Sequence, residues 1–230
     1  MCFIVLNGLA IVLISVTFTD YALRLWGSAA WAGAKAGCAP RGYAPATMTP
    51  EQARVMKEEL HGVDQEIRSI TEGQDGTGLE TRPGSSSWSV AENLQHLILT
   101  AEAMLPLIDD AVAKLERAGG KASRPSGLGF MGWMLVKALE PPPRMKSRTS
   151  KPFEPLATGD PLTLADRLRA TNVKLGALID RASGLPTSAV KIASPFDARV
   201  KYNVYAALRI TLVHARRHLW QAREARASAR

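Results

Sequence analysis

The chain has 230 residues, a net charge of +8, and 46% hydrophobic and 22% charged residues, a composition that excludes wholesale disorder and suits one domain with a real core. Aromatic residues make up only 6%, which argues against a β-sandwich or barrel. The two cysteines, Cys2 and Cys38, exclude a disulfide framework and a cysteine-based zinc finger.

The first 47 residues differ from the rest of the chain. Residues 2–18 form an apolar run without a charged side chain, slightly short of the ~20 residues that span a bilayer. Lys and Arg occur only after this run, so the positive start of a usual signal peptide is missing. Three interpretations stay open: a membrane anchor that leaves the rest of the chain in the cytoplasm, an atypical signal peptide, or a start codon assigned too far upstream. All three leave the functional domain in residues 48–230, which we expect to be cytoplasmic, with a membrane-anchored domain as the alternative.

The first predicted helix covers residues 50–71, where apolar residues recur at helical spacing. Thr49 is the expected N-cap, Pro50 the first helical residue and Gln52 the partner in a capping box. Met48 comes directly before this helix start and is the natural first residue under the third interpretation. A stretch rich in Ser and Gly, residues 72–87, then predicts an irregular connection.

The second predicted helix has a sharp start and a sharp end. Ser89 and Glu92 form a second capping box, and Trp88 stands just outside it, where a hydrophobic staple residue belongs. An apolar stripe follows over residues 94–115, and the glycine pair 119–120 predicts the end of the helix.

Two more long helices follow a segment rich in Pro, Gly and basic residues. This segment covers residues 120–161 and contains a short predicted apolar helix at 130–139. A third long helix is predicted at 162–183, and an extended piece follows at 189–196. The last helix is predicted to begin near Ala198 or Tyr202 and to end at about 225. Four long amphipathic helices predict an all-α fold, a four-helix bundle with a Pro/Gly-rich insertion between the second and third helices.

Histidine is the residue type that points to chemistry, and the chain has only four: His61, His96, His214 and His218. His214 and His218 lie one turn apart on one helix face, and His96 lies inside the apolar stripe of the second helix. A third imidazole from a facing helix would complete a three-histidine site for Zn²⁺, Ni²⁺ or Fe²⁺. The competing interpretation is that His214 and His218 are surface residues and that His96 is a hydrogen-bonded residue at the edge of the core. His61 has no partner at ligand spacing and is expected on the surface.

Two motifs resemble those of the DinB-like superfamily. The segment from Trp88 to Leu97 is similar to its second-helix motif W-S-x-x-E-x-L-x-H-L, and the segment from His214 to Gln221 is similar to its last-helix motif H-x-x-[RH]-H-x-x-Q. Residues 194–196 are similar to the family's H-P-x-F-G segment, although Ser194 stands where a His is frequent and residues 197–198 replace the usual Gly. The resemblance covers about residues 50–225.

The resemblance implies a four-helix bundle and a divalent metal ion held by His96, His214 and His218. It also implies family activities such as transfer of low-molecular-weight thiols, thiol-dependent isomerisation and metal-dependent hydrolysis. The departures at Ser194 and at residues 197–198 concern the mouth of the site and therefore the substrate.

The leading hypothesis is a metal-dependent enzyme that activates a thiol or water for transfer to, or hydrolysis of, a small electrophile, with a low-molecular-weight thiol as a candidate cofactor. Gln221 and Glu92 each lie one turn from a predicted ligand and are expected to orient the ligands. The alternative is a non-catalytic helical binding or stress-response protein that uses the same bundle.

A small-molecule substrate is the expected partner, and a membrane is a partner only if residues 2–18 act as an anchor. The scattered basic residues and the lack of a recognition motif predict no nucleic-acid partner, and homodimerisation through the outer faces of the bundle stays open.

Overall fold

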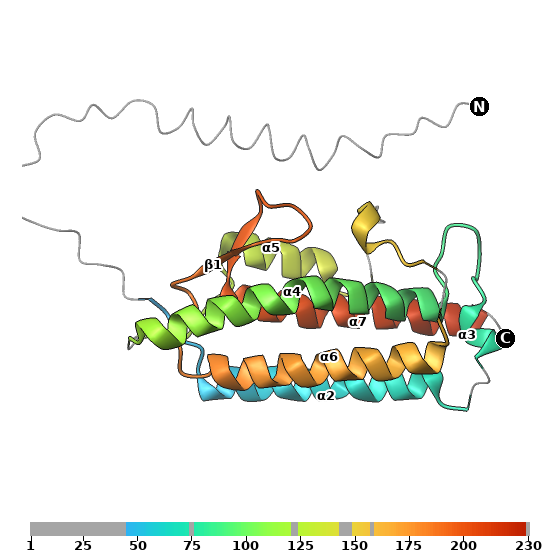
Figure 1. Cartoon of the computed structure of the whole chain (residues 1–230), viewed down its shortest axis with the longest axis horizontal. Helices are drawn as coiled ribbons and strands as arrows, with labels where there is room; N and C mark the ends of the chain where they lie inside the picture. The colour runs from blue at the N-terminus through green and yellow to red at the C-terminus, as the bar shows by residue number, and fades with distance from the viewer. Residues whose placement is uncertain (1–44, 74–75, 121–123, 143–148, 157–158, 229–230) are drawn as a thin grey trace, which may run out of the picture. The chain divides into compact units, whose positions relative to one another are not determined.

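The computed structural model describes residues 45–73, 76–120, 124–142, 149–156 and 159–228 (Figure 1). The apolar run at residues 2–18, and with it the three interpretations of the first segment, lies outside the described residues. None of the helices among the described residues is both long enough and apolar enough to cross a bilayer.

Four long helices form the body of the domain: α2 (Pro50–Thr71), α4 (Val90–Ala118), α6 (Pro161–Ala182) and α7 (Val204–Ser228). Both predicted capping boxes are present, one at Thr49 with Gln52 and one at Ser89 with Glu92. Gly119 caps the end of α4, as predicted. The all-α prediction is confirmed, and within the described ranges strands are confined to one two-stranded sheet.

The helices follow one another around the bundle in the order α2, α6, α4, α7 (Figure 1). Helices α4 and α6 run parallel, because Glu102 pairs with Arg167 and, further along both helices, Glu116 pairs with Arg181. A parallel neighbour needs a connection that crosses the length of the bundle. The predicted Pro/Gly-rich insertion supplies that connection.

The insertion carries a short α-helix, α5 (Gly129–Leu139), and one turn of 3₁₀-helix, η1 (Lys151–Phe153). The predicted helix at 130–139 is thereby confirmed. Gly132 lets α5 approach α7, since a Cβ atom at this position would lie only 2.5 Å from the Cβ atom of Ala206. Helix α5 therefore lies against α7, outside the four-helix body (Figure 1).

Two local predictions are corrected. Residues 72–87 contain a one-turn helix, α3 (Thr77–Glu80), which buries Leu79. The last helix begins at Val204 rather than near Ala198 or Tyr202, because the residues before it form an antiparallel pair of strands, β1 (Lys191–Ala193) and β2 (Lys201–Asn203).

The strand pair replaces the expected helix start for a packing reason. Ile192 and Tyr202 are directly paired, and both side chains are buried. Asn203 then ends the sheet and caps α7, since its Oδ1 accepts a hydrogen bond from the backbone N–H of Ala206 at 2.8 Å.

The start of the described chain closes one end of the bundle. The backbone of Met48 donates to the carbonyl of Leu185 at 3.0 Å and accepts from the N–H of Gly184 at 2.8 Å. Thr47 exchanges two backbone hydrogen bonds with the segment before α5, donating to Arg124 at 2.9 Å and accepting from Ser126 at 2.7 Å. Residues just before α2 thus belong to the folded domain.

Candidate metal centre

Helices α4 and α7 run antiparallel side by side and bring three of the four histidines together. His96 comes from α4, and His214 and His218 come from α7. Their ring centroids lie 4.4 to 5.2 Å apart, and one nitrogen from each ring can be chosen so that all three nitrogens lie within 4.8 Å of one another. His96 and His218 are buried, and His214 is partly buried. The predicted grouping of these histidines is therefore present in the fold.

Two of the rings are held by hydrogen bonds on the nitrogen that faces away from the cluster. His96 Nδ1 lies 2.7 Å from the carbonyl oxygen of Phe153 in η1, and His218 Nδ1 lies 3.1 Å from Oδ1 of Asn93. A carbonyl oxygen only accepts, so both Nδ1 atoms carry the proton and both Nε2 atoms keep a lone pair. The Asn93 amide is itself oriented, since its Nδ2 donates to the carbonyl of Ser89 at 2.9 Å.

The spacing of the nitrogens suits a small ion with tetrahedral ligands. Nε2 of His96 and Nε2 of His214 are 3.3 Å apart. Two nitrogens bound at ~2.0–2.1 Å to one tetrahedral Zn²⁺ would lie about 3.3–3.4 Å apart. The two rings thus already hold the separation that a shared ion requires, and the donor set suits zinc, nickel or iron.

Burial lowers the pKa of each of the three imidazoles. For His96 the hydrogen bond to the carbonyl of Phe153 offsets part of that effect. Burial lowers the pKa of His214 to about 3, with smaller contributions from the charges of His96 and Arg217. Burial and the neighbouring charges also hold the pKa of His218 well below its usual value. The rings are therefore neutral at pH 7, which is the state that binds a metal ion.

The two residues expected to orient the ligands have different surroundings. The side chain of Gln221 lies near His218 and offsets a small part of the lowering of that histidine's pKa. Glu92 is buried; it accepts from the backbone N–H of Ser89 at 2.9 Å and forms an ion pair with Arg82. Burial would raise the pKa of Glu92, but the hydrogen bonds from Arg82 and Ser89 outweigh it and lower the pKa. Glu92 thus stabilises the start of α4, the helix that carries His96.

Asn93 and Phe153 hold the rings but were not singled out from the sequence. Asn93 lies three residues before His96, and a buried-side polar residue directly before the apolar stripe of α4 was the available signal. Phe153 contributes only its backbone carbonyl, which every residue type possesses, so no side-chain pattern could indicate it.

Aromatic side chains surround the cluster. The ring of Trp88 lies 4.9 Å from that of His96 and stacks on His218 at 5.8 Å. Phe196, from the loop between β1 and β2, lies 6.2 Å from His214 and 4.6 Å from Phe153. Phe196 is 42% exposed, so part of its ring reaches solvent beside the cluster.

Ser194, the residue that departs from the family motif, has its own partners. Its hydroxyl accepts from the backbone N–H of Phe196 at 3.3 Å, and its side chain lies near enough to Tyr202 to offset part of the rise in the pKa of that phenol. Tyr202 is buried against Met104, and burial raises the pKa of its phenol. Ser194 therefore fixes the loop that carries Phe196.

A buried cation lies beside the cluster. Arg217 precedes His218 in the chain and is almost fully buried, and one guanidinium nitrogen donates to the carbonyl of Ala138 at 3.0 Å. Burial lowers the pKa of Arg217, but an arginine stays protonated in proteins. Its charge makes this part of the domain favourable for an anionic group.

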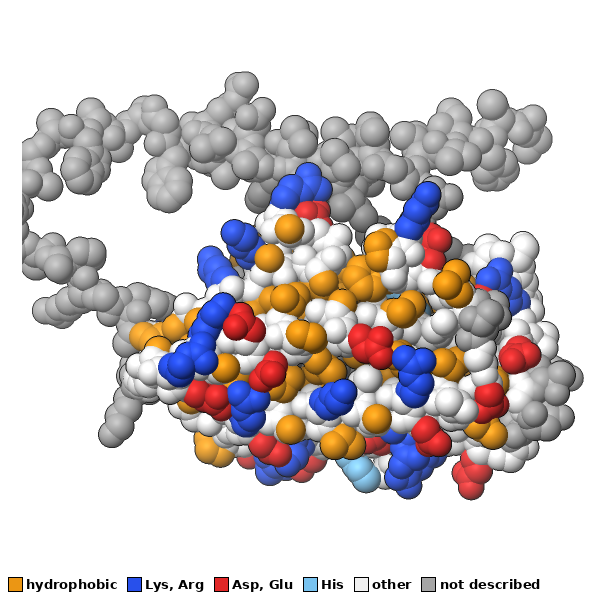
Figure 2. Space-filling view, viewed as in Figure 1, with side chains coloured by type: hydrophobic (Ala, Val, Ile, Leu, Met, Phe, Trp, Pro, Cys, Tyr) orange, Lys and Arg blue, Asp and Glu red, His pale blue; other side chains and the backbone are white. Residues whose placement is uncertain are grey.

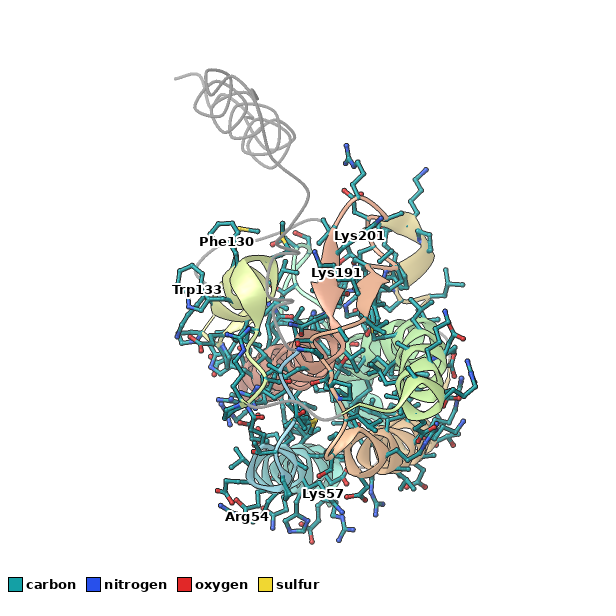
Figure 3. All side chains as sticks on the ribbon, turned by 90° about the vertical axis from the view of Figure 1, so that its left-hand side faces the viewer. Arg54, Lys57, Phe130, Trp133, Lys191 and Lys201 are labelled. Atoms are coloured by element: carbon teal, nitrogen blue, oxygen red, sulfur yellow. The ribbon has the colours of Figure 1, made fainter. Side chains whose placement is uncertain are left out.

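His61, the fourth histidine, is exposed on α2, as expected, and its Nε2 lies 3.0 Å from the amide nitrogen of Gln65. It lines a surface depression with Arg54 and Lys57, whose side chains are labelled in Figure 3. Arg54 pairs with acidic residues of its own helix and Lys57 with Asp180. The depression is thus a surface feature built from paired charges.

Comparison with known proteins gives one finding. A family model described as the DinB superfamily matches residues 59–222, a span that contains all three clustered histidines. No curated protein and no solved structure matches the chain.

Proposed function

We propose, from the premise that the chain belongs to the DinB superfamily, that this protein is a metal-dependent enzyme whose single divalent ion is held by His96, His214 and His218. Its reaction would be the transfer of a thiol or of water to a small electrophile. The ion would be zinc, nickel or iron, and a low-molecular-weight thiol is the proposed cofactor.

The convergence of one nitrogen from each of the three rings, all within 4.8 Å of one another, is the observation that carries this proposal. Hydrogen bonds at Nδ1 of His96 and His218 fix which nitrogen of each ring is available. Such bonds orient metal-binding imidazoles and raise their basicity. A histidine cluster kept only for packing would have no need to direct its lone pairs to one point.

A bound divalent ion would lower the pKa of a coordinated thiol or water and so supply a nucleophile near neutral pH. The chain's own residues provide the conditions for this chemistry. Trp88 and Phe196 lie against the cluster and would limit the access of bulk water to it, which would strengthen electrostatic interactions inside it. The fixed charge of Arg217 favours a thiolate or hydroxide over its neutral form.

Metal content and thiol transfer together test the proposal. The full chain, purified without a histidine tag, should contain about one divalent ion per chain by elemental analysis. It should also accelerate the consumption of a small alkylating electrophile by a low-molecular-weight thiol, or hydrolysis of that electrophile, and a chelator should abolish the acceleration. Stoichiometric metal without any turnover would favour the alternative, a helical binding or stress-response protein. Absence of tight metal after supplementation would overturn the metal site itself.

A further inference from the structure

We propose that the exposed aromatic face of α5, together with two lysines of the β1–β2 hairpin, docks on the surface of a lipid bilayer that contains anionic headgroups. This docking face consists of Phe130, Trp133, Lys191 and Lys201. It lies outside the histidine cluster and does not depend on the proposed reaction.

Helix α5 exposes large aromatic side chains that its own packing does not use. Phe130 is 68% exposed and Trp133 is 52% exposed, and the two lie three residues apart on one face of the helix. The opposite face is formed by Gly132 and Val136, which are buried toward the bundle. Figure 3 shows Phe130 and Trp133 at the periphery of the domain, on the outer side of α5. Exposed aromatic side chains on a helix at the protein surface are typical of contact with the headgroup region of a membrane.

Positive charge lies next to this aromatic face. Lys191 and Lys201 are both exposed on the strand pair, and among the described residues neither forms an ion pair. Strand β2 is joined to the segment before α5, because Asn203 donates to the carbonyl of Gly127 at 2.9 Å. In Figure 3 both lysines lie on the half of the domain that carries α5, away from Arg54 and Lys57.

On the face formed by α4 and α6, by contrast, acidic and basic side chains offset each other. Figure 2 shows acidic and basic side chains interspersed over the face formed by α4 and α6. Several of these charges pair with each other, as Glu116 does with Arg181. Net attraction to anionic lipid is therefore expected on the α5 side, where the hairpin lysines have no acidic partner among the residues that the structure describes.

The sequence before the described domain favours a membrane, and not another protein, as the partner of the docking face. Thr47 is hydrogen-bonded to Arg124 and Ser126, so the described chain begins beside the segment that leads into α5. That preceding sequence contains the uncharged apolar run at residues 2–18. A single weak membrane contact gives only marginal binding, and a second contact on the same chain strengthens it through effective concentration. A second copy of the protein is a poorer occupant, since it would bring the same unpaired lysines together.

Vesicle binding by the full chain tests this proposal. We expect sedimentation with vesicles of phosphatidylcholine and phosphatidylserine to exceed that with phosphatidylcholine alone. The double change Phe130→Ser and Trp133→Ser should weaken binding roughly tenfold or more, the loss expected when two aromatic side chains no longer leave water. The double change Lys191→Gln and Lys201→Gln should reduce only the preference for phosphatidylserine. Val173→Ser is the matched control, because Val173 on α6 is 73% exposed and lies on a different helix.

A spectroscopic measurement keeps the test informative if the whole chain binds vesicles strongly. Brominated lipid should quench the fluorescence of Trp133, seen as the difference between the wild type and a Trp133→Phe variant. Equal binding by the wild type and the Phe130/Trp133 variant, without quenching of Trp133, would overturn the proposal. Loss of self-association in that variant, with vesicle binding unchanged, would instead assign this face to a second copy and also overturn it.

Discussion

The apolar cluster around Ile108 and Leu208 and the histidine cluster around His96 lie between the same pair of helices, α4 and α7, yet they have different chemistry. The apolar cluster contains fully buried side chains from α2, α4 and α7, together with Met48. The histidine cluster buries three polar rings whose pKa values burial has lowered. The first region gains stability from removing apolar surface from water, whereas the second keeps neutral nitrogen donors in one place.

One helix pair, α4 and α7, therefore supports apolar packing and a candidate site at the same time. Burial of a histidine costs free energy unless its ring nitrogens find partners. Phe153 and Asn93 supply those partners on the outer side of the rings. A metal ion would supply the partner on the inner side, so the histidine cluster should depend on metal and the apolar cluster should not.

The largest effect should come from the apolar cluster. Ile108→Ala removes a fully buried side chain, and the cavity should lower the free energy of unfolding by about 2–5 kcal/mol. Chemical denaturation should give the same loss with added zinc and with a chelator. The exposed Val173→Ala on α6 is the control and should change stability by less than about 0.5 kcal/mol. A loss of stability in Ile108→Ala that appears only with metal would remove the distinction between the two regions.

The histidine cluster should show a metal-dependent effect of similar size. A ligand at a hundredfold excess over its dissociation constant stabilises the folded state by about 2.7 kcal/mol. His96→Ala, His214→Ala and His218→Ala should each lose this increment, so their melting temperatures should fall below the wild type only when metal is present. His61→Ala should behave as the wild type, since His61 is exposed on α2. Equal destabilisation of the three variants in chelator would identify these histidines as core residues.

Substitution of Asn93 should have a smaller effect, a loss of metal affinity at the histidine cluster. Asn93→Leu removes the acceptor for Nδ1–H of His218 while keeping a similar volume. Loss of such an orienting partner typically weakens metal binding 10- to 100-fold, or about 1.4–2.7 kcal/mol. Competition with a chromophoric chelator would measure the change. Gln65→Leu is the matched control, because Gln65 contacts the exposed His61; unchanged affinity in Asn93→Leu would show that Asn93 does not position the ring.

The pH dependence should also distinguish the two regions, as a gradual change with no effect at neutral pH. In chelator, the unfolded chain takes up protons on its histidines below pH ~6.5, whereas the folded chain resists this because the pKa of His214 is lowered to about 3. The free energy of unfolding should therefore decrease as the pH falls from about 6.5 toward 3, and be unaffected by His214 above this window. Denaturation at several pH values should show a shallower decrease in His214→Ala than in Ile108→Ala. The same slope in both variants would count against the lowered pKa.

Much of the fold could be predicted from the sequence because local signals mark the helix ends. Thr49 and Ser89 begin α2 and α4 through capping boxes, and Gly119 ends α4. The extended piece predicted at 189–196 contains β1, but its pairing with β2 could not be predicted, since three-residue strands are too short to show a period and Ile192 pairs with Tyr202 across a loop. The parallel course of α4 and α6 depends on long-range packing, which no local pattern contains.

The site, like the helix ends, was predictable only where a local sequence pattern indicates it. His214 and His218 share a helix face, so their spacing alone predicted that they lie close together. Asn93 and the Phe153 carbonyl could not be assigned, because their contacts depend on how α4 meets α7 and η1. The pairing of Glu92 with Arg82 likewise depends on the loop before α4.

Metal stoichiometry in the single histidine variants tests the central claim most directly. The claim is that one ion joins α4 to α7 through His96, His214 and His218. Elemental analysis of the tag-free chain after supplementation and desalting should give about one ion per wild-type chain and far less for each of the three variants, with His61→Ala unchanged. Loss of metal in the His214 and His218 variants with full retention in His96→Ala would contradict the account, since the site would then be a chelate on α7 alone.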